Sequence, residues 1–317
     1  MFGVFQSTSD LIYSTNFQDP GFVFAPFDVN NDPIKIIGEL EKTSIEAQNK
    51  EAHNSKTEFS ERGRDQHISL VEKAIEAIAD NSFKKVVVSR VVEKASNKAP
   101  WEILNSLLGQ YPTAFCYWWY HPSIGMWLGA TPEQLVHFQE GTFHTSSLAG
   151  TLPVIENTNP KWSLKEYEEQ QMVTDYIVQN LQGKTVQIET SGPLSHKAGK
   201  LWHLKTLISG QLKSINELDD VVRALHPTPA VCGLPKEEAL QFVLKNEAYQ
   251  REFYTGYLGP VHVEENGKVS LFVNLRCLKF SSGLAQLFVG GGITASSIPE
   301  KEWMETQYKS STILDVL

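Results

Sequence analysis

The sequence predicts a mixed α+β architecture built on large antiparallel sheets. Segments typical of strands outnumber those typical of helices, and they come in runs instead of alternating with helices one for one. That pattern argues against a doubly wound parallel sheet. No Pro/Gly-rich linker, internal repeat or low-complexity tract interrupts the 317 residues. We therefore expect one domain over residues 1–317, in which 1–80 is the less typical part.

The N-terminal part is the least regular. Residues 1–30 suggest short strands and turns, as in LIYS and GFVFAPF, and the polar stretch 34–64 is typical of a linker or an exposed helix. Residues 67–80 then predict an amphipathic helix, because their apolar residues recur at helical spacing. The β-branched residues of KKVVVSRVV (84–92) predict the strand that follows.

Strands dominate the centre of the chain. They are predicted at 114–120, 126–129, 134–139, 142–148 and 185–189. Helical patterns cover 161–181 and 235–245.

The C-terminal part is predicted as two strands, a glycine run and a helix. The strands lie at 270–280 and 285–289, and the second runs into Gly290-Gly291-Gly292. The last helix is predicted to begin near Pro299, because proline favours the first helical turn.

Composition narrows the function. There are 37 acidic and 28 basic residues, a net charge of −9, which disfavours nucleic-acid binding through phosphate contacts. The first ten residues do not resemble a secretory signal, and no run of about 18 apolar residues exists. We expect a cytoplasmic protein without membrane partners. Cys116, Cys232 and Cys277 fit neither a disulfide framework nor zinc spacing and are predicted to be buried.

Two predicted helices each carry a pair of carboxylates three residues apart. Glu166 and Glu169 form one pair, and Glu302 and Glu305 the other. Residues at this spacing share one helix face, so four carboxylates converge if the helices face each other. Such a cluster would hold a hard cation such as Mg²⁺. For either pair alone, a solvated acidic face is the alternative.

Five further features could carry chemistry. A sheet-facing Lys85 would have a lowered pKa and could act as a base, although a lysine there can also simply end a strand in solvent. Glu133 follows a turn and could be an acid or merely exposed. His203 has the surroundings of a core histidine. Arg276, within a predicted strand, could bind a carboxylate. The run 290–292 could let an anion approach the backbone or form a tight turn.

Together these residues resemble the chorismate-utilising enzymes, which comprise isochorismate, salicylate, anthranilate and aminodeoxychorismate synthases. The resemblance spans nearly all of residues 84–311. It is carried by the segments KKVVVSR (84–90), GATPEQL (129–135), SLAGT (147–151), SLKEYEEQ (163–170), HLKTLISGQL (203–212), ALHPTPAVCGLPKEEA (224–239), REFYTGYLG (251–259), LFVNLRC (271–277) and GGGITASSIPEKEWMETQYK (290–309). It implies a β-sandwich core flanked by helices.

Two positions resemble the isochorismate synthase branch. Water-adding members carry a lysine where Lys85 stands, and Ala230 occupies a position where amine-adding and salicylate-forming members tend to have threonine. The sequence departs from the family at Gln170, where a histidine is usual, and in a shorter segment 150–166.

The resemblance implies roles for individual residues. Lys85 is the general base that activates water for attack at C2 of chorismate, and Glu133 is the general acid that protonates the leaving C4 hydroxyl. Glu169 and Glu305 hold Mg²⁺, supported by Glu166 and Glu302. The residues expected at the substrate are Gly150, His203, Ala230, Arg276, Gly290 and Lys309.

The expected activity is therefore Mg²⁺-dependent isochorismate synthesis, feeding menaquinone or siderophore synthesis. A salicylate synthase is the alternative within the family, and a catalytically silent chorismate-fold binding protein is the alternative outside catalysis. No glutaminase subunit is expected. The oligomeric state is left open by the sequence, and a monomer is compatible with it.

Overall fold

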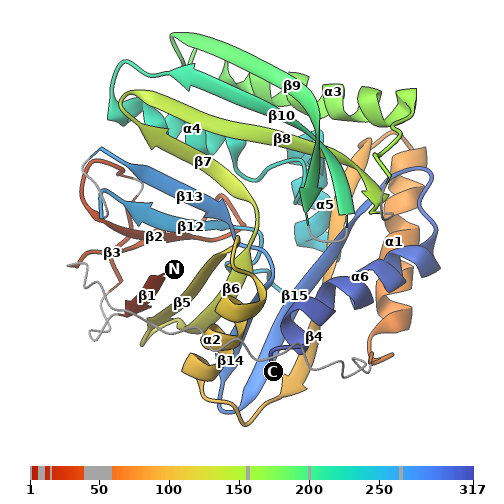
Figure 1. The fold of residues 1–317 in the computed structure, drawn as a ribbon. Coiled ribbons are helices and arrows are strands. Elements are labelled where there is room, and N and C mark those ends of the chain that lie inside the picture. The colour runs from red at the N-terminus through yellow and green to blue at the C-terminus, as the bar shows by residue number, and fades with distance from the viewer. Residues whose placement is uncertain are drawn as a thin grey trace.

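The computed structural model contains two large β-sheets with helices packed against them (Figure 1). It describes residues 2–5, 11–14, 16–38, 59–154, 158–198, 201–263 and 267–317. The described strand pairs are antiparallel, with β1 against β5 as the one parallel pair among them. The predicted α+β class with antiparallel sheets is confirmed.

One sheet has seven strands in the order β1-β5-β6-β14-β15-β4-β11. Their bounds are β1 Phe2–Phe5, β5 Phe115–His121, β6 Gly125–Thr131, β14 Cys277–Ser281, β15 Leu284–Ile293, β4 Lys85–Ala95 and β11 Gly233–Leu234.

The other sheet has eight strands in the order β3-β2-β12-β13-β7-β8-β10-β9. Their bounds are β3 Ile34–Ile36, β2 Gly21–Ala25, β12 Tyr257–Val261, β13 Val269–Val273, β7 Gln134–Gln139, β8 Thr142–Pro153, β10 Leu201–Gln211 and β9 Gln187–Ala198.

The helices cover the outer faces of both sheets. α3 (Leu164–Leu181) and α4 (Leu218–Leu225, preceded by the short 3₁₀ helix η1, Ile215–Glu217) pack on the eight-stranded sheet. α1 (Arg64–Ala79), α5 (Lys236–Asn246) and α6 (Pro299–Leu314) lie along β4 and β15, and α2 (Pro100–Gln110) packs on β5 and β6. Figure 1 shows α1 and α6 beside each other.

An aromatic cluster fills the space between the sheets. Phe24 of β2 contacts Trp119 of β5 and Trp127 of β6, with ring centroids 4.8 and 5.9 Å apart. Phe253 stacks on Phe24 at 4.2 Å. These side chains belong to one buried cluster with members from both sheets. Since buried aromatic rings contribute large apolar areas, this cluster fixes how one sheet lies on the other.

Two sequence predictions about the C-terminal part are wrong. The predicted strand 270–280 is broken, because β13 ends at Val273 and Arg276 has a left-handed backbone (φ 49°) before β14 begins in the other sheet. Likewise the glycine run is no turn. It lies inside β15, where Gly290, Gly291 and Gly292 pair with residues 89, 88 and 87 of β4.

Among the other predicted elements, β7 has the predicted ends, the short strand suggested at LIYS (11–14) is only an isolated bridge at Tyr13, and the rest are found with shifted ends. The part of the predicted linker between residues 39 and 58 lies outside the described residues. Five strands are longer than predicted, namely β4, β6, β8, β9 and β15, and β3 occupies part of the predicted polar linker. Six elements were missed, namely α2, β10, η1, α4, β11 and β12. The three cysteines are buried and free, as predicted.

A buried ion pair joins β4 to the chain before β12. Glu247 and Arg251 have side chains only 2% exposed, and Arg251 Nη2 lies 2.6 Å from Glu247 Oε1. Arg251 also donates to the carbonyl oxygens of Val87 (2.7 Å) and Val231 (3.0 Å). Glu247 Oε1 accepts the backbone N–H of Ser89 at 2.7 Å. One pair therefore fixes β4 against the loop that follows α4.

We expect Arg251→Met to lower the free energy of unfolding by about 3–5 kcal/mol, because the variant leaves the Glu247 carboxylate buried without its cation. Urea unfolding followed by circular dichroism measures this change. The matched control is Arg223→Met, which breaks an i,i+4 pair with Asp219 whose arginine side chain is 60% exposed. That pair is worth less than about 1 kcal/mol. Equal losses in the two variants would contradict the prediction.

Candidate active site

Two crossings between the sheets lie side by side. β6 passes into β7 through Pro132 and Glu133, and β13 passes into β14 through 274–276. The N–H of Ala130 donates to the Arg276 carbonyl at 3.1 Å, and the N–H of Val273 donates to the Glu133 carbonyl at 3.0 Å. Backbone hydrogen bonds thus hold Glu133 and Arg276 in neighbouring positions although they are far apart in sequence.

Glu133 is placed where a carboxyl group is hard to ionise. Burial raises its pKa to about 7, and the nearby charges of Lys85, Lys309 and Arg276 act in the opposite direction. A carboxyl group with this pKa is populated in both protonation states at neutral pH. That is the property needed of a general acid.

Lys85 begins β4 and shares that environment. Burial lowers its pKa, while Glu169, Glu133 and Glu305 raise it and Lys309 lowers it further. The side chain lies across Gly292, since a Cβ there would stand 3.1 Å from Lys85 Cε. The glycine therefore leaves room for the lysine. The alternative that Lys85 ends its strand in solvent does not describe this side chain.

Helix α6 places three charged side chains over the same glycine run. A Cβ on Gly291 would lie 3.3 Å from Glu302 Oε2 and 3.7 Å from Glu305 Oε1. Lys309 Nζ lies 2.6 Å from Glu305 Oε1 and donates to the Gly290 carbonyl at 2.9 Å. β14 pairs with β15 only as far as Leu287. The α6 side chains thus meet β15 beyond the part covered by β14.

The acidic pairs of α3 and α6 contribute unequally to the charge around Lys85. Glu169 of α3 and Glu305 of α6 both act on Lys85, so they belong to one electrostatic environment. Burial, and then the neighbouring Glu305, raise the pKa of Glu302 against a hydrogen bond from Ser297. Glu166 instead accepts the N–H of Ser163 at 2.6 Å in a capping box. Among the described residues, no three metal-ligating side chains are grouped closely enough to enclose an ion.

A second group of predicted residues meets at the end of β8. His203 of β10 contacts the Gly150 carbonyl through Nδ1 at 3.0 Å. Gly150 has φ +68°, a conformation that favours glycine, and a Cβ there would meet Glu166 at 3.4 Å. Burial lowers the pKa of His203, and Lys309 and Arg276 act in the same direction. His203 therefore lies in the electrostatic reach of the site's cations.

Arg276 is held from one side. Its Nη1 donates to the Thr312 hydroxyl at 2.8 Å. Burial lowers its pKa, and Tyr254, Tyr111, Glu305 and Glu133 oppose that shift. The predicted carboxylate-binding role needs such a buried, oriented guanidinium.

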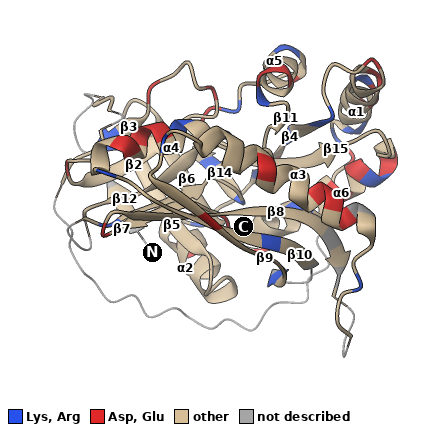
Figure 2. Ribbon diagram, turned by 90° about the horizontal axis from the view of Figure 1, so that it is seen from above, with Lys and Arg blue, Asp and Glu red and all other residues tan. Residues whose placement is uncertain are grey.

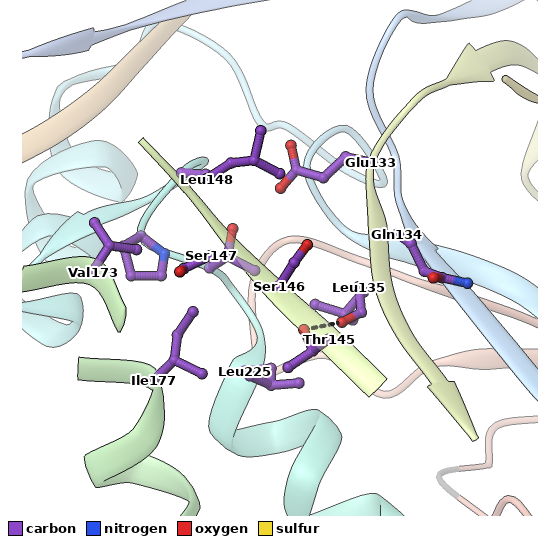
Figure 3. A pocket seen from close by; sticks show the side chains of 13 residues that line it. Glu133, Gln134, Leu135, Thr145, Ser146, Ser147, Leu148, Val173, Ile177 and Leu225 are labelled. Atoms are coloured by element: carbon purple, nitrogen blue, oxygen red, sulfur yellow. Dashed lines mark hydrogen bonds between the residues drawn. The ribbon is translucent and has the colours of Figure 1, made fainter. Parts of the chain in front are cut away.

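A cavity opens beside Glu133 and Ala230 (Figure 3). It is a partly open pocket, in which the space not occupied by protein atoms, open solvent included, amounts to about 330 Å³. Its walls come from β7, β8, α3, α4 and the loop after α4, and they are formed by Glu133, Gln134, Leu135, Thr145, Ser146, Ser147, Leu148, Val173, Ile177, Leu225, Thr228, Pro229 and Ala230. Of the residues predicted for the site, only Glu133 and Ala230 line it.

The sequence alone suggested no role for Arg251 or Thr228, although both lie in segments that carry the family resemblance, 251–259 and 224–239. It showed Gln170 only as a departure from the family. Gln170 is buried, and its Nε2 donates to the hydroxyls of Ser147 (2.9 Å) and Thr206 (3.1 Å). For Gln170, the one signal in the sequence was its position as a polar side chain within an apolar face of a predicted helix.

Acidic residues occur on both helices for which acidic pairs were predicted. Figure 2 shows acidic residues on both α3 and α6, in accordance with the predicted acidic pairs. None of the helices in the described ranges is long and apolar enough to span a membrane.

Relatives and solved structures agree on the fold. The chain is 30% identical to isochorismate synthase MenF from Escherichia coli over 78% of this chain and 59% of that protein, and 30% identical to isochorismate synthase EntC from E. coli over 78% and 66%. It therefore spans less than two thirds of the length of these relatives. The crystal structure of a putative 2,3-dihydroxybenzoate-specific isochorismate synthase, DhbC from Bacillus anthracis, superposes with a TM-score of 0.78 at 26% identity, covering 94% of this chain and 84% of that one.

The sequence model of the family described as chorismate binding enzyme matches residues 27–317. This match covers most of the chain, including every site residue considered above. The chain belongs to the chorismate-binding enzyme family.

Proposed function

We propose that the protein is an isochorismate synthase, which adds water at C2 of chorismate and removes the C4 hydroxyl. The observation that carries the proposal is the pairing of Lys85 and Glu133. Each acts electrostatically on the other, and burial moves the pKa of each toward neutrality from opposite sides. A base and an acid can thus be present together at the same pH.

In this reaction the neutral Lys85 amine takes a proton from the water that attacks C2. Glu133 gives its proton to the C4 hydroxyl, which leaves as water. One water is consumed and one is released, so the net change is the position of the hydroxyl. The reaction is reversible because the same two groups can act in exchanged roles.

The substrate is a dicarboxylate and enters an acidic protein. We propose that Arg276 and Lys309, two of the cations that act on Glu133, bind the carboxylates of the substrate, together with backbone N–H groups near Gly150 and Gly290. His203 and Ala230 are proposed to lie beside the ring. Local cations, and not net charge, thus determine binding.

The acidic residues fit a Mg²⁺ site in their chemistry. Glu302 and Glu305 converge over Gly291, and burial and then the charge of Glu305 raise the pKa of Glu302. A cation there would offset the charge of both carboxylates. We propose that Glu169 and Glu305 hold Mg²⁺, with Glu302 and Glu166 supporting them. When bound, the ion would offset the charge of the ring carboxylate.

A salicylate synthase, which also eliminates pyruvate, is the competing function. Ala230 favours isochorismate as the final product, because its methyl group brings no hydroxyl to the cavity beside Glu133. We further propose that the protein acts in the cytoplasm without a glutaminase subunit. Its product would feed menaquinone synthesis or siderophore synthesis.

Incubation with chorismate and Mg²⁺, followed by chromatography, is expected to yield isochorismate alone. Lys85→Ala should lower kcat by about 10²–10⁴-fold, the range for loss of a general base. Lys84→Ala, at the exposed neighbouring position, is the matched control and should retain activity. Salicylate with pyruvate would overturn the assignment, and full activity of Lys85→Ala would overturn the role of the base.

Gly292→Ala should fold but lose roughly tenfold in kcat, because Lys85 must shift by a few tenths of an ångström. Its Cβ would stand 3.1 Å from Lys85 Cε and displace the amine. The backbone of Gly292 is not left-handed, so alanine is not excluded by conformation. Gly38→Ala, which meets nothing within 4 Å, is the control. Unchanged kcat in Gly292→Ala with an unchanged melting temperature would contradict the placement of Lys85.

The pH dependence of kcat/KM should show an alkaline limb near pH 7. Glu133 must be protonated to act as the acid, and its pKa of about 7 means that this form is lost as pH rises above that value. The acidic limb should reflect Lys85, whose lowered pKa makes the neutral amine available at lower pH than usual. Glu133→Gln should remove the alkaline limb from the residual activity. A limb that persists in this variant belongs to another group.

A further inference from the structure

Thr131 joins the two crossings between the sheets through its side chain. It is the last residue of β6, it is fully buried, and Pro132 and Glu133 follow it before β7 begins. The Thr131 hydroxyl donates to the carbonyl of Val273 at 2.6 Å. Val273 is the last residue of β13 and precedes the crossing that carries Arg276. A side chain from one crossing is therefore bonded to the backbone of the other.

The same hydroxyl oxygen also binds the backbone of the proposed acid. The N–H of Glu133 donates to Thr131 Oγ1 at 3.3 Å, and the N–H of Val273 donates to the Glu133 carbonyl at 3.0 Å. With the bond from the Thr131 hydroxyl to Val273, these contacts close a ring of three hydrogen bonds. The ring includes the peptide groups on both sides of the Glu133 Cα. Since each residue has only two soft backbone dihedrals, the ring fixes the direction in which the Glu133 side chain leaves the backbone.

Glu133 lies outside both strand ladders. The pairing of β6 with β5 ends at Thr131, and the pairing of β7 with β13 begins at Gln134. Pro132, between them, is exposed and has no N–H to donate. The bond from the Glu133 N–H to Thr131 therefore takes the place of a ladder partner at this crossing.

The far side of the ring is tied to the core. The residue after Val273, Asn274, is fully buried, and its N–H donates to the Gly256 carbonyl at 2.8 Å. Its side-chain oxygen accepts the Tyr117 hydroxyl at 2.6 Å, and its side-chain nitrogen donates to the Phe253 carbonyl at 2.9 Å. Tyr117 and Phe253 belong to the aromatic cluster between the sheets. The ring is thus anchored on packed, hydrogen-bonded structure.

The proposed reaction depends on where the Glu133 carboxyl lies. A general acid must be within hydrogen-bond distance of the group that it protonates. A displacement of about 1 Å can cost 10²-fold in rate, even when the substituted residue is far from the chemistry. Thr131 is buried and is not among the residues that line the cavity beside Glu133, so its effect on the reaction passes through the backbone.

We propose that Thr131 is a positioning residue for Glu133. Its hydroxyl binds the Val273 carbonyl and the Glu133 N–H at once, and so holds the Glu133 carboxyl at the place where it protonates the leaving C4 hydroxyl of chorismate. Thr131 neither touches the substrate nor transfers a proton. The inference rests on the proposed function, because that function makes Glu133 the acid.

Two substitutions at Thr131 separate the hydroxyl from the packing. Thr131→Val keeps the branched shape and removes the hydroxyl, whereas Thr131→Ser keeps the hydroxyl and removes a methyl group. We expect kcat to fall about tenfold in Thr131→Val and to remain at the wild-type value in Thr131→Ser. KM should stay unchanged in both, since Arg276 has separate bonds to the Ala130 N–H and to Thr312.

Wild-type kcat in Thr131→Val would overturn the proposal, as would a loss in Thr131→Ser that equals or exceeds the loss in Thr131→Val. Melting temperatures show whether the variants fold. Should Thr131→Val not fold, Thr131→Cys replaces it with the same expected direction, because a thiol donates only weakly.

Ser96→Ala is the matched control. The Ser96 hydroxyl likewise accepts the N–H of the second residue after it, Lys98, at 3.3 Å and donates to a distant carbonyl, that of Leu317, at 3.3 Å. Ser96 is also buried. The variant loses the same kinds of hydrogen bond away from Glu133 and should keep wild-type kcat and KM. A loss of kcat equal to that of Thr131→Val would mean that such bonds act through stability alone, and would overturn the proposal.

Crystal structures test the same role without turnover. In Thr131→Val the Glu133 carboxyl should lie about 0.5 Å or more from its wild-type place, which exceeds the tolerance of a catalytic group, and in Thr131→Ser it should not move. An unmoved carboxyl in Thr131→Val would overturn the proposal. If the wild-type protein left chorismate unchanged while the carboxyl moved as expected, the proposed function would fail and the effect of Thr131 on the place of Glu133 would remain.

Discussion

The buried pair of Glu247 and Arg251 is the interaction on which the site's arrangement depends. Arg251 binds the carbonyl of Val87, two residues from Lys85, and the carbonyl of Val231, next to Ala230. Glu247 holds the following part of β4 through Ser89. A buried ion pair stabilises little by itself, since desolvation offsets much of the attraction. Its value here is geometric, because its hydrogen bonds fix the strand of the proposed base against the loop beside the cavity.

Burial gives Lys85 and Glu133 their chemistry. The same loss of solvation lowers the pKa of one group and raises that of the other, so a single enclosed environment makes a base and an acid. The glycine run makes the enclosure possible by leaving room for Lys85 on one residue and for the α6 carboxylates on the next. Tight packing would otherwise exclude either group from β15.

Much of the fold was readable from the sequence where the pattern was local. The amphipathic α1, the strand at Lys85 and the proline at the start of α6 were predicted from spacing and composition. α4 was missed because it is short, with only eight residues. The broken strand at Arg276 was missed because FVNLRCLKF is a continuous β pattern, and only the change of sheet requires a left-handed residue there.

The sequence by itself determined the family, the α+β class and the set of polar residues available for chemistry, because motif order and residue type are properties of the chain. Tertiary structure decided how those residues are used. It divided the four helix carboxylates, with Glu166 capping α3 and Glu302 and Glu305 over Gly291. It placed the glycine run inside a strand and opened a cavity where β7 leaves β8. These outcomes depend on pairing between distant strands and on burial, which no local pattern contains.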